Sequence, residues 1–140
     1  MIEKPTKCVL IIDEALPAGV LANTAVILGI TLGRLVPEYI GQDVLDGSGH
    51  IHKGIVSQPI PVLKGNASLL KTLREKLYTS SFEDVTVVDF SDIAQNCHIY
   101  DEFLLAAKFT PETDFTYLGL LLYGDKKKVN KLTGSIPLLR

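Results

Sequence analysis

The chain has 140 residues, of which 46% are hydrophobic and 21% charged, and its formal net charge at pH 7 is −2. This length and composition predict a single globular domain, residues 1–140, and exclude an intrinsically disordered chain. The lack of a basic excess argues against a nucleic-acid partner, because phosphate backbones are bound through clustered Lys and Arg side chains.

The cysteine content and the start of the chain bear on the compartment. Two cysteines, Cys8 and Cys97, are too few for a disulfide framework, and residues 1–7 lack the layout of a signal peptide. We therefore expect a cytoplasmic protein.

Residues 8–12 form a continuous apolar run, which predicts a central strand covered by helices on both sides. Residues 16–36 follow without a charge between Glu14 and Arg34 and predict a long helix with Pro17 in its first turn. A membrane span needs about 20 predominantly apolar residues, and this run contains three glycines and several polar residues. We predict a buried helix and no membrane segment.

The first helix carries small residues along one stripe, at positions 18, 22, 25, 29 and 33. Such a stripe allows a sheet or a second helix to approach closely. The other side is apolar as well, and helices that are apolar all round are usually buried on more than one side. This pattern predicts either a covering segment or a homodimer formed through the first helix.

The rest of the chain alternates between strand and helix patterns. We expect a polar loop over 38–53 with a turn at 46–49, a strand at 54–58, and an edge segment with two prolines at 59–62. A helix at 67–79 capped by Asn66, a strand at 85–88, a helix at 101–108 and a strand at 117–123 follow. The order predicts a three-layer α/β/α domain with a mixed sheet of four or five strands.

Several stretches resemble known families. Residues 118–120 with Gly124, followed by 129–139, are similar to the carboxyl end of type II peptidyl-tRNA hydrolases. More closely, the whole chain resembles a bacterial family of unknown function that shares the fold of those hydrolases. The stretches that carry this resemblance are 22–29, 46–54, 59–63 and 132–134. The resemblance implies a peptidyl-tRNA hydrolase type II-like fold.

The residues that those hydrolases use for catalysis are mostly replaced. The hydrolases place a lysine directly after the glycine at the helix start, whereas Val20 follows Gly19 here. Thr24 and Ile27 stand where the hydrolases continue with a glutamine and a histidine, and of their aspartate-alanine-glycine motif Asp89 alone remains. Without the lysine, the cation that would stabilise developing negative charge is missing. The resemblance therefore implies the fold without that activity.

Polar groups near the start of the first helix suggest a site. Its first amides lack a side-chain cap and can bind an anion, a substrate carbonyl or water. Asn23 and Thr24 need hydrogen-bond partners, from the protein or from a ligand, because an unsatisfied buried polar group costs about 1–3 kcal/mol. The sequence thus predicts a small-molecule site near the helix start; its candidate residues are Asp13, Gly19, Asn23, Thr24, Asp46, His52 and Asp89.

Other chemistry is less specified. His50, His52 and Asp46 are residue types that bind metals, but the spacing fixes no third strong ligand and a plain hairpin explains them equally. We expect no metal and no cofactor. No catalytic residue is assigned, and whether the protein is an enzyme stays open. The alternatives to ligand binding are a hydrolase with His52 or Asp89 as base and a dimeric interaction module.

Overall fold

The computed structural model describes residues 4–140, and within this range the chain forms six strands and five α-helices. In chain order they are β1 (Thr6–Asp13), α1 (Ala18–Leu35), β2 (Val44–Leu45), β3 (Ile51–His52), β4 (Val62–Gly65), α2 (Ala67–Leu77), β5 (Thr86–Ser91), α3 (Asp92–Gln95), α4 (Tyr100–Lys108), β6 (Tyr117–Asp125) and α5 (Lys126–Thr133). Three short 3₁₀ turns are η1 (Pro37–Tyr39), η2 (Ser80–Phe82) and η3 (Glu112–Asp114).

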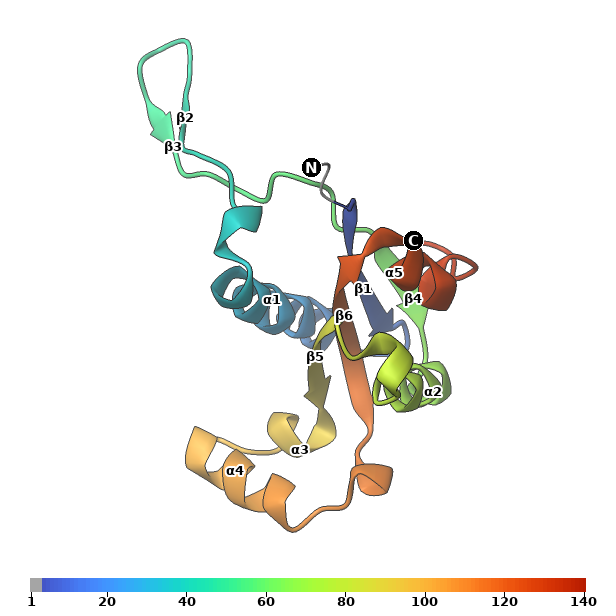
Figure 1. The fold of residues 1–140 in the computed structure, drawn as a ribbon. Helices are drawn as coiled ribbons and strands as arrows, with labels where there is room; N and C mark the ends of the chain where they lie inside the picture. The colour runs from blue at the N-terminus through green and yellow to red at the C-terminus, as the bar shows by residue number, and fades with distance from the viewer. Residues whose placement is uncertain (1–3) are drawn as a thin grey trace.

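Four strands form one mixed sheet in the order β4-β1-β6-β5 (Figure 1). β1 runs parallel to β4 and antiparallel to β6, and β6 runs antiparallel to β5. The outer edge of β4 receives a bridge between Leu63 and Leu138, supported by a 2.9 Å hydrogen bond from the Lys64 amide to the Pro137 carbonyl. Within residues 4–140, β5 has β6 as its one strand neighbour. The expected mixed sheet is confirmed, and β5 is its open edge.

Apolar clusters cover both faces of the sheet. Alternate β1 residues point to opposite faces: Val9 and Ile11 pack with α2 and α5, whereas Cys8 and Leu10 pack with α1. The whole of β1 from Cys8 to Ile12 is buried. The predicted central strand is therefore correct, and the layers are α1, the sheet, and α2 with α5.

Helix α1 differs from its predicted burial. Three of its 18 residues are buried, Thr24, Leu28 and Leu32, which recur every four residues and lie on one face. Most of the small-residue stripe points away from the sheet: a Cβ built on Gly29 or Gly33 meets nothing within 4 Å, and within the stripe Ala25 packs against the core. The prediction of a helix buried on more than one side is therefore wrong for the single chain, and the homodimer alternative stays a prediction. By length and composition α1 is able to cross a membrane, but here it packs on the sheet.

Residues 40–56 form a projecting hairpin, called the hairpin arm below (Figure 1). The predicted turn is present, with Gly49 at φ +85°. The predicted strand at 54–58 is absent, apart from one bridge between Ile40 and Val56. Two segments of the hairpin arm cross closely at Gly54, because a Cβ there would lie 1.8 Å from the Gly41 carbonyl oxygen.

Local sequence signals predict the start of α2 but not the presence of α5. Asn66 caps α2 as predicted, its side chain accepting a 2.8 Å hydrogen bond from the Leu69 amide. By contrast, no helix is predicted after the strand at 117–123, whereas in the structure β6 continues to Asp125 and α5 begins at Lys126. Val129 and Thr133, one helical turn apart, are the buried residues that anchor α5.

Candidate functional site

The predicted residues at the start of α1 do not line a common cavity. Asp13 accepts a 2.9 Å hydrogen bond from the Ala15 amide, which fixes the turn after β1. Thr24 is fully buried and donates its hydroxyl hydrogen to the Val20 carbonyl at 2.8 Å, so its side chain is satisfied within the helix. Gly19 and Asn23 are exposed. None of these four residues lines the cavities of about 610, 420 and 400 Å³ that residues 4–140 form.

Asp46 and His52 lie in the hairpin arm and contact each other. His52 Nε2 lies 2.8 Å from Asp46 Oδ2, and the amides of Ser48 and His50 donate to Asp46 Oδ1. The hydrogen bond from His52, followed by these backbone amides, lowers the pKa of Asp46. The pair therefore closes the hairpin turn. Within the described residues no group of three or more His, Cys, Asp or Glu side chains is placed to hold a metal ion.

The hairpin arm and the start of α1 are far apart. The arm follows η1 at the carboxyl end of α1, whereas Gly19 lies in the first turn of the helix. An α-helix of 18 residues is about 27 Å long. The structure therefore does not bring Asp46 and His52 to Gly19, because the whole length of α1 separates them.

Asp89 lies on β5, where its Oδ2 accepts a 3.0 Å hydrogen bond from Arg74 Nε of α2. Both side chains are largely shielded from solvent: that of Asp89 is 29% exposed and that of Arg74 is 15% exposed. Because a partly desolvated ion pair loses much of its stabilisation when either partner is removed, this contact ties α2 to the edge strand.

A second polar cluster lies on the same face, where Lys71 contacts Glu112 and Tyr117 donates its hydroxyl to Glu112 Oε1 at 2.9 Å. Burial by itself raises the pKa of Glu112, and the hydrogen bonds from Tyr117 and Lys71 outweigh it, so the pKa lies below its ordinary value. Burial, followed by the hydrogen bond to Glu112, raises the pKa of Tyr117. The cluster holds η3 against α2 and β6, and its role is therefore structural.

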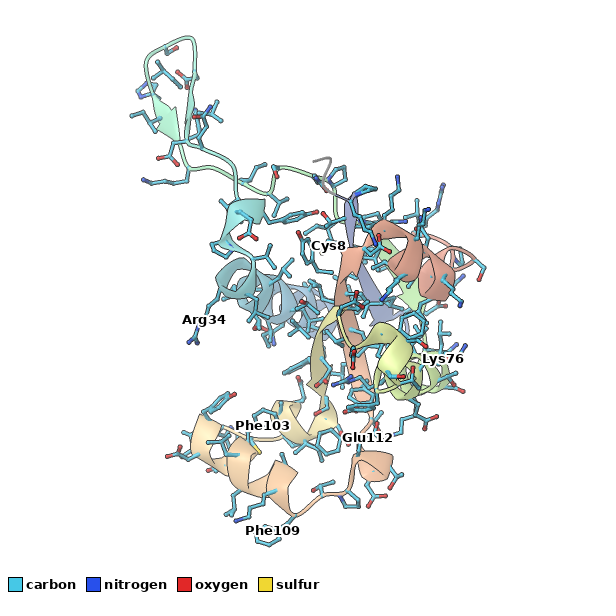
Figure 2. All side chains as sticks on the ribbon, viewed as in Figure 1. Cys8, Arg34, Lys76, Phe103, Phe109 and Glu112 are labelled. Atoms are coloured by element: carbon cyan, nitrogen blue, oxygen red, sulfur yellow. The ribbon has the colours of Figure 1, made fainter. Side chains whose placement is uncertain are left out.

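A cavity of about 420 Å³ opens at the free edge of β5, between α1 and the α3–α4 region. We call it the edge cavity. Its lining is mainly apolar and includes three aromatic rings; the residues are Ile27, Thr31, Val88, Asp89, Phe90, Ala94, Cys97, His98, Ile99, Tyr100 and Phe103. Figure 2 shows Phe103 on the side of α4 that faces α3, whereas Phe109 points away from the body. Asp89 is the one predicted candidate that lines it.

Sequence reasoning missed the other lining residues, because they come from three separate stretches of chain. The neighbours Cys97 and His98 are the one local signal, since both are potentially reactive side chains. As adjacent residues they do not form a nucleophile and base pair, but both contribute to this cavity.

A larger cavity of about 610 Å³ lies at the carboxyl ends of β1 and β4. Glu14 and Lys64 line it and form a 3.7 Å ion pair, and residues 137–140 supply the rest. Both charged side chains are about half exposed, and pairs of this kind contribute little binding energy or stability. The edge cavity is smaller but combines aromatic rings with several polar groups, which is the usual composition of a small-molecule site.

The two cysteines are expected to differ in reactivity. Cys8 is 1% exposed, and burial raises the pKa of its thiol to about 12, whereas Cys97 is partly exposed. Because the thiolate is the reactive form, an aromatic disulfide reagent at about pH 8 should label one thiol per native chain and two in denaturant. A Cys97→Ser variant should show no rapid labelling; rapid labelling of two native thiols would contradict the burial of β1.

Comparisons with known proteins bear on the fold and the family of the chain. In structure the chain is similar to Atu0240, a protein of unknown function from Agrobacterium tumefaciens strain C58, with a TM-score of 0.85 and 20% sequence identity over 96% of this chain and 98% of that chain. At this identity the likeness shows the fold alone. Among curated proteins none matches the chain in sequence. The model of DUF2000, a family of proteins of unknown function, matches residues 6–140, and the chain therefore belongs to the DUF2000 family.

Proposed function

We propose that the protein binds a small, neutral and largely apolar molecule in the edge cavity. The observation that carries this proposal is the cavity itself: its volume of about 420 Å³ falls within the range of small-molecule sites, about 300–1,000 Å³. Its walls come from α1, β5 and the segment that leads into α4. A ligand enclosed by these three elements would remove apolar side chains from water, which favours binding.

The charges around the edge cavity favour a neutral ligand. No Lys or Arg lines it, and the carboxylate of Asp89 is already paired with Arg74 at 3.0 Å. A phosphate-bearing ligand would find no cation there to replace its hydration. Phe90, Tyr100 and Phe103 instead offer aromatic surfaces, which pack against an aromatic ligand in offset or edge-to-face geometry.

The polar lining groups would orient such a molecule. The Thr31 hydroxyl donates to the Ile27 carbonyl at 3.1 Å, so its oxygen is left to accept a hydrogen bond. The imidazole of His98 and the hydroxyl of Tyr100 offer both donors and acceptors. We therefore expect a ligand with an aromatic or aliphatic body and one or two hydrogen-bonding groups.

Two threonines provide a matched test. Thr31→Phe places a ring in the mouth of the edge cavity, and Thr72→Phe makes the same change on α2, where the threonine hydroxyl likewise donates to the carbonyl four residues earlier at 3.1 Å. Both threonines are exposed, so both variants should fold. Neutral fragments such as indole, phenol and benzyl alcohol are screened by saturation-transfer NMR, with labelling of Cys97 as a second readout.

The expected result is that some fragments bind the natural chain and the Thr72→Phe variant, slow the labelling of Cys97, and bind Thr31→Phe at least tenfold more weakly. Tenfold corresponds to about 1.4 kcal/mol, a modest loss for a blocked pocket. Absence of binding by every fragment, or equal binding by both variants, would refute the proposal.

The hydrolase alternative has less support. Asp89 is engaged by Arg74 and His52 by Asp46, and the partly buried Val20 occupies the position at which type II peptidyl-tRNA hydrolases carry their lysine. The relation to that hydrolase fold is a proposal that rests on the sequence resemblance. A cytoplasmic location is likewise proposed, and two free cysteines are consistent with a reducing compartment.

A further inference from the structure

Exposed hydrophobic side chains gather on three segments of the molecule. Of the 16 large hydrophobic side chains that are exposed within residues 4–140, all but Tyr78 and Leu138 belong to α1, to the hairpin arm, or to residues 99–109. The last segment, α4 with its flanking residues, is called the α4 arm. Single exposed hydrophobics are normal on protein surfaces, but gathered ones mark interaction sites.

The three segments lie on one side of the protein. In Figure 1 the hairpin arm and the α4 arm both extend on the side to which the carboxyl end of α1 points. The edge cavity, lined by α1 and the α4 arm together, places these two segments next to each other, and the hairpin arm follows α1 through η1. The open edge of β5 lies between α1 and the α4 arm. Unprotected edges of this kind are usually covered in native proteins.

The accessible surface is too large for a compact monomer. The chain exposes 9170 Å², whereas a compact monomer of 15.3 kDa exposes about 7,100 Å². The excess is about 2,000 Å² per chain, or about 4,000 Å² for two copies, within the total of about 2,000–5,000 Å² that obligate homodimers bury. The hairpin arm would gain support from a second copy, because β2 and β3 have two residues each and an isolated hairpin is at best marginally stable in water.

The outer face of α1 fits a second copy of itself. It carries no charge from its start to Gly33, and Arg34 lies in its last turn, so the stretch up to Gly33 can meet a second copy without repulsion or unpaired charges. At Gly29 and Gly33 a Cβ would meet nothing within 4 Å, which leaves room for a second helix to approach the backbone. Ile30, with 72% of its surface exposed, stands beside them. A twofold dimer requires a self-complementary patch of this kind.

We propose that a second copy of this chain packs on the outer face of α1, and that the hairpin arm and the α4 arm of each copy close over its partner. This proposed dimer goes beyond ligand binding in the edge cavity and does not depend on it, because neither Gly29 nor Ile30 lines that cavity.

Sedimentation equilibrium of the full chain, from about 1 to 100 μM, measures the association. The expected mass is twice 15.3 kDa. Gly29→Leu should sediment with the monomer mass, or with a dissociation constant raised at least tenfold. The variant should still fold, since nothing lies within 4 Å of the new Cβ and leucine favours helix over glycine; its far-UV circular dichroism checks this.

A charge variant and its control make the test independent of Gly29. Ile30→Glu places a carboxylate on the outer face of α1, whereas Leu138→Glu makes the same change at the opposite edge of the sheet, on a side chain that is 48% exposed. Ile30→Glu should be monomeric and Leu138→Glu dimeric. Fragment binding in the edge cavity should be unchanged in Gly29→Leu, which separates this test from that of the proposed function.

Three results would overturn the proposal. The first is a natural chain that sediments as a monomer throughout the concentration range. The second is dimerisation of Gly29→Leu and Ile30→Glu with the affinity of the natural chain. Flotation of a monomeric natural chain with phosphatidylcholine–phosphatidylglycerol vesicles, lost in Ile30→Glu, would also overturn it and would assign the apolar face to a membrane surface.

Discussion

Replacing Leu28 by alanine is expected to lower the free energy of unfolding by about 3 kcal/mol. Leu28 is fully buried and one of three side chains through which α1 is anchored to the sheet, so its loss leaves a cavity that the few remaining contacts cannot close. Urea unfolding followed by circular dichroism at one fixed protein concentration measures the change, with an unaltered denaturant slope.

Asn23→Ala is the control on the same helix. Asn23 is exposed, so its removal should change the free energy of unfolding by no more than about 0.5 kcal/mol. If Asn23→Ala lowered the free energy of unfolding as much as Leu28→Ala, Asn23 would have to contact a group outside the single chain. A small effect of Leu28→Ala would contradict the packing of α1 on the sheet.

Gly119→Ala is expected to destabilise the protein by about 1–3 kcal/mol, because it overpacks the crossing of α1 and β6. A Cβ at this position would lie 3.0 Å from Thr24 Cγ2 and 3.2 Å from Leu28 Cδ1, both on α1, and 3.3 Å from the Ile11 carbonyl oxygen. Thr24 is fully buried and β-branched, so it has little freedom to move aside. The shift in the urea midpoint measures the effect.

Gly19→Ala makes the same substitution where nothing lies within 4 Å of the new Cβ. It should be neutral or stabilising by up to about 1 kcal/mol, because alanine favours helix over glycine. Equal destabilisation by both substitutions would mean that loss of glycine flexibility, and not crowding beneath α1, determines the effect.

Local sequence signals were sufficient for much of the fold. The unbroken apolar run at 8–12 indicated a strand buried on both faces, and Asn66 marked the start of α2, because both signals involve residues close together in the chain. The lysines at 126–128 concealed α5, whose two anchoring residues are too few to produce a clear period. The resemblance to a family of unknown function is confirmed by the DUF2000 match.

The candidate site was harder to derive. The seven predicted residues were grouped by their chemistry, and the structure distributes them between the start of α1, the hairpin arm and β5. Asp46 and His52 do meet, because six residues and a turn bring them together. Asp89 reaches the edge cavity only because β5 is the outermost strand and α4 returns beside it.

The sequence by itself determined the main strands, the extent of α1 and α2, and the uncharged character of α1, since these depend on the order and period of side chains. The tertiary structure alone decided which face of α1 is buried, because that choice depends on Gly119 and the neighbouring strands beneath the helix. It also decided that most of the small-residue stripe points away from the sheet and that Cys97 lines a cavity. These features arise from contacts between distant segments, and no local pattern records such contacts.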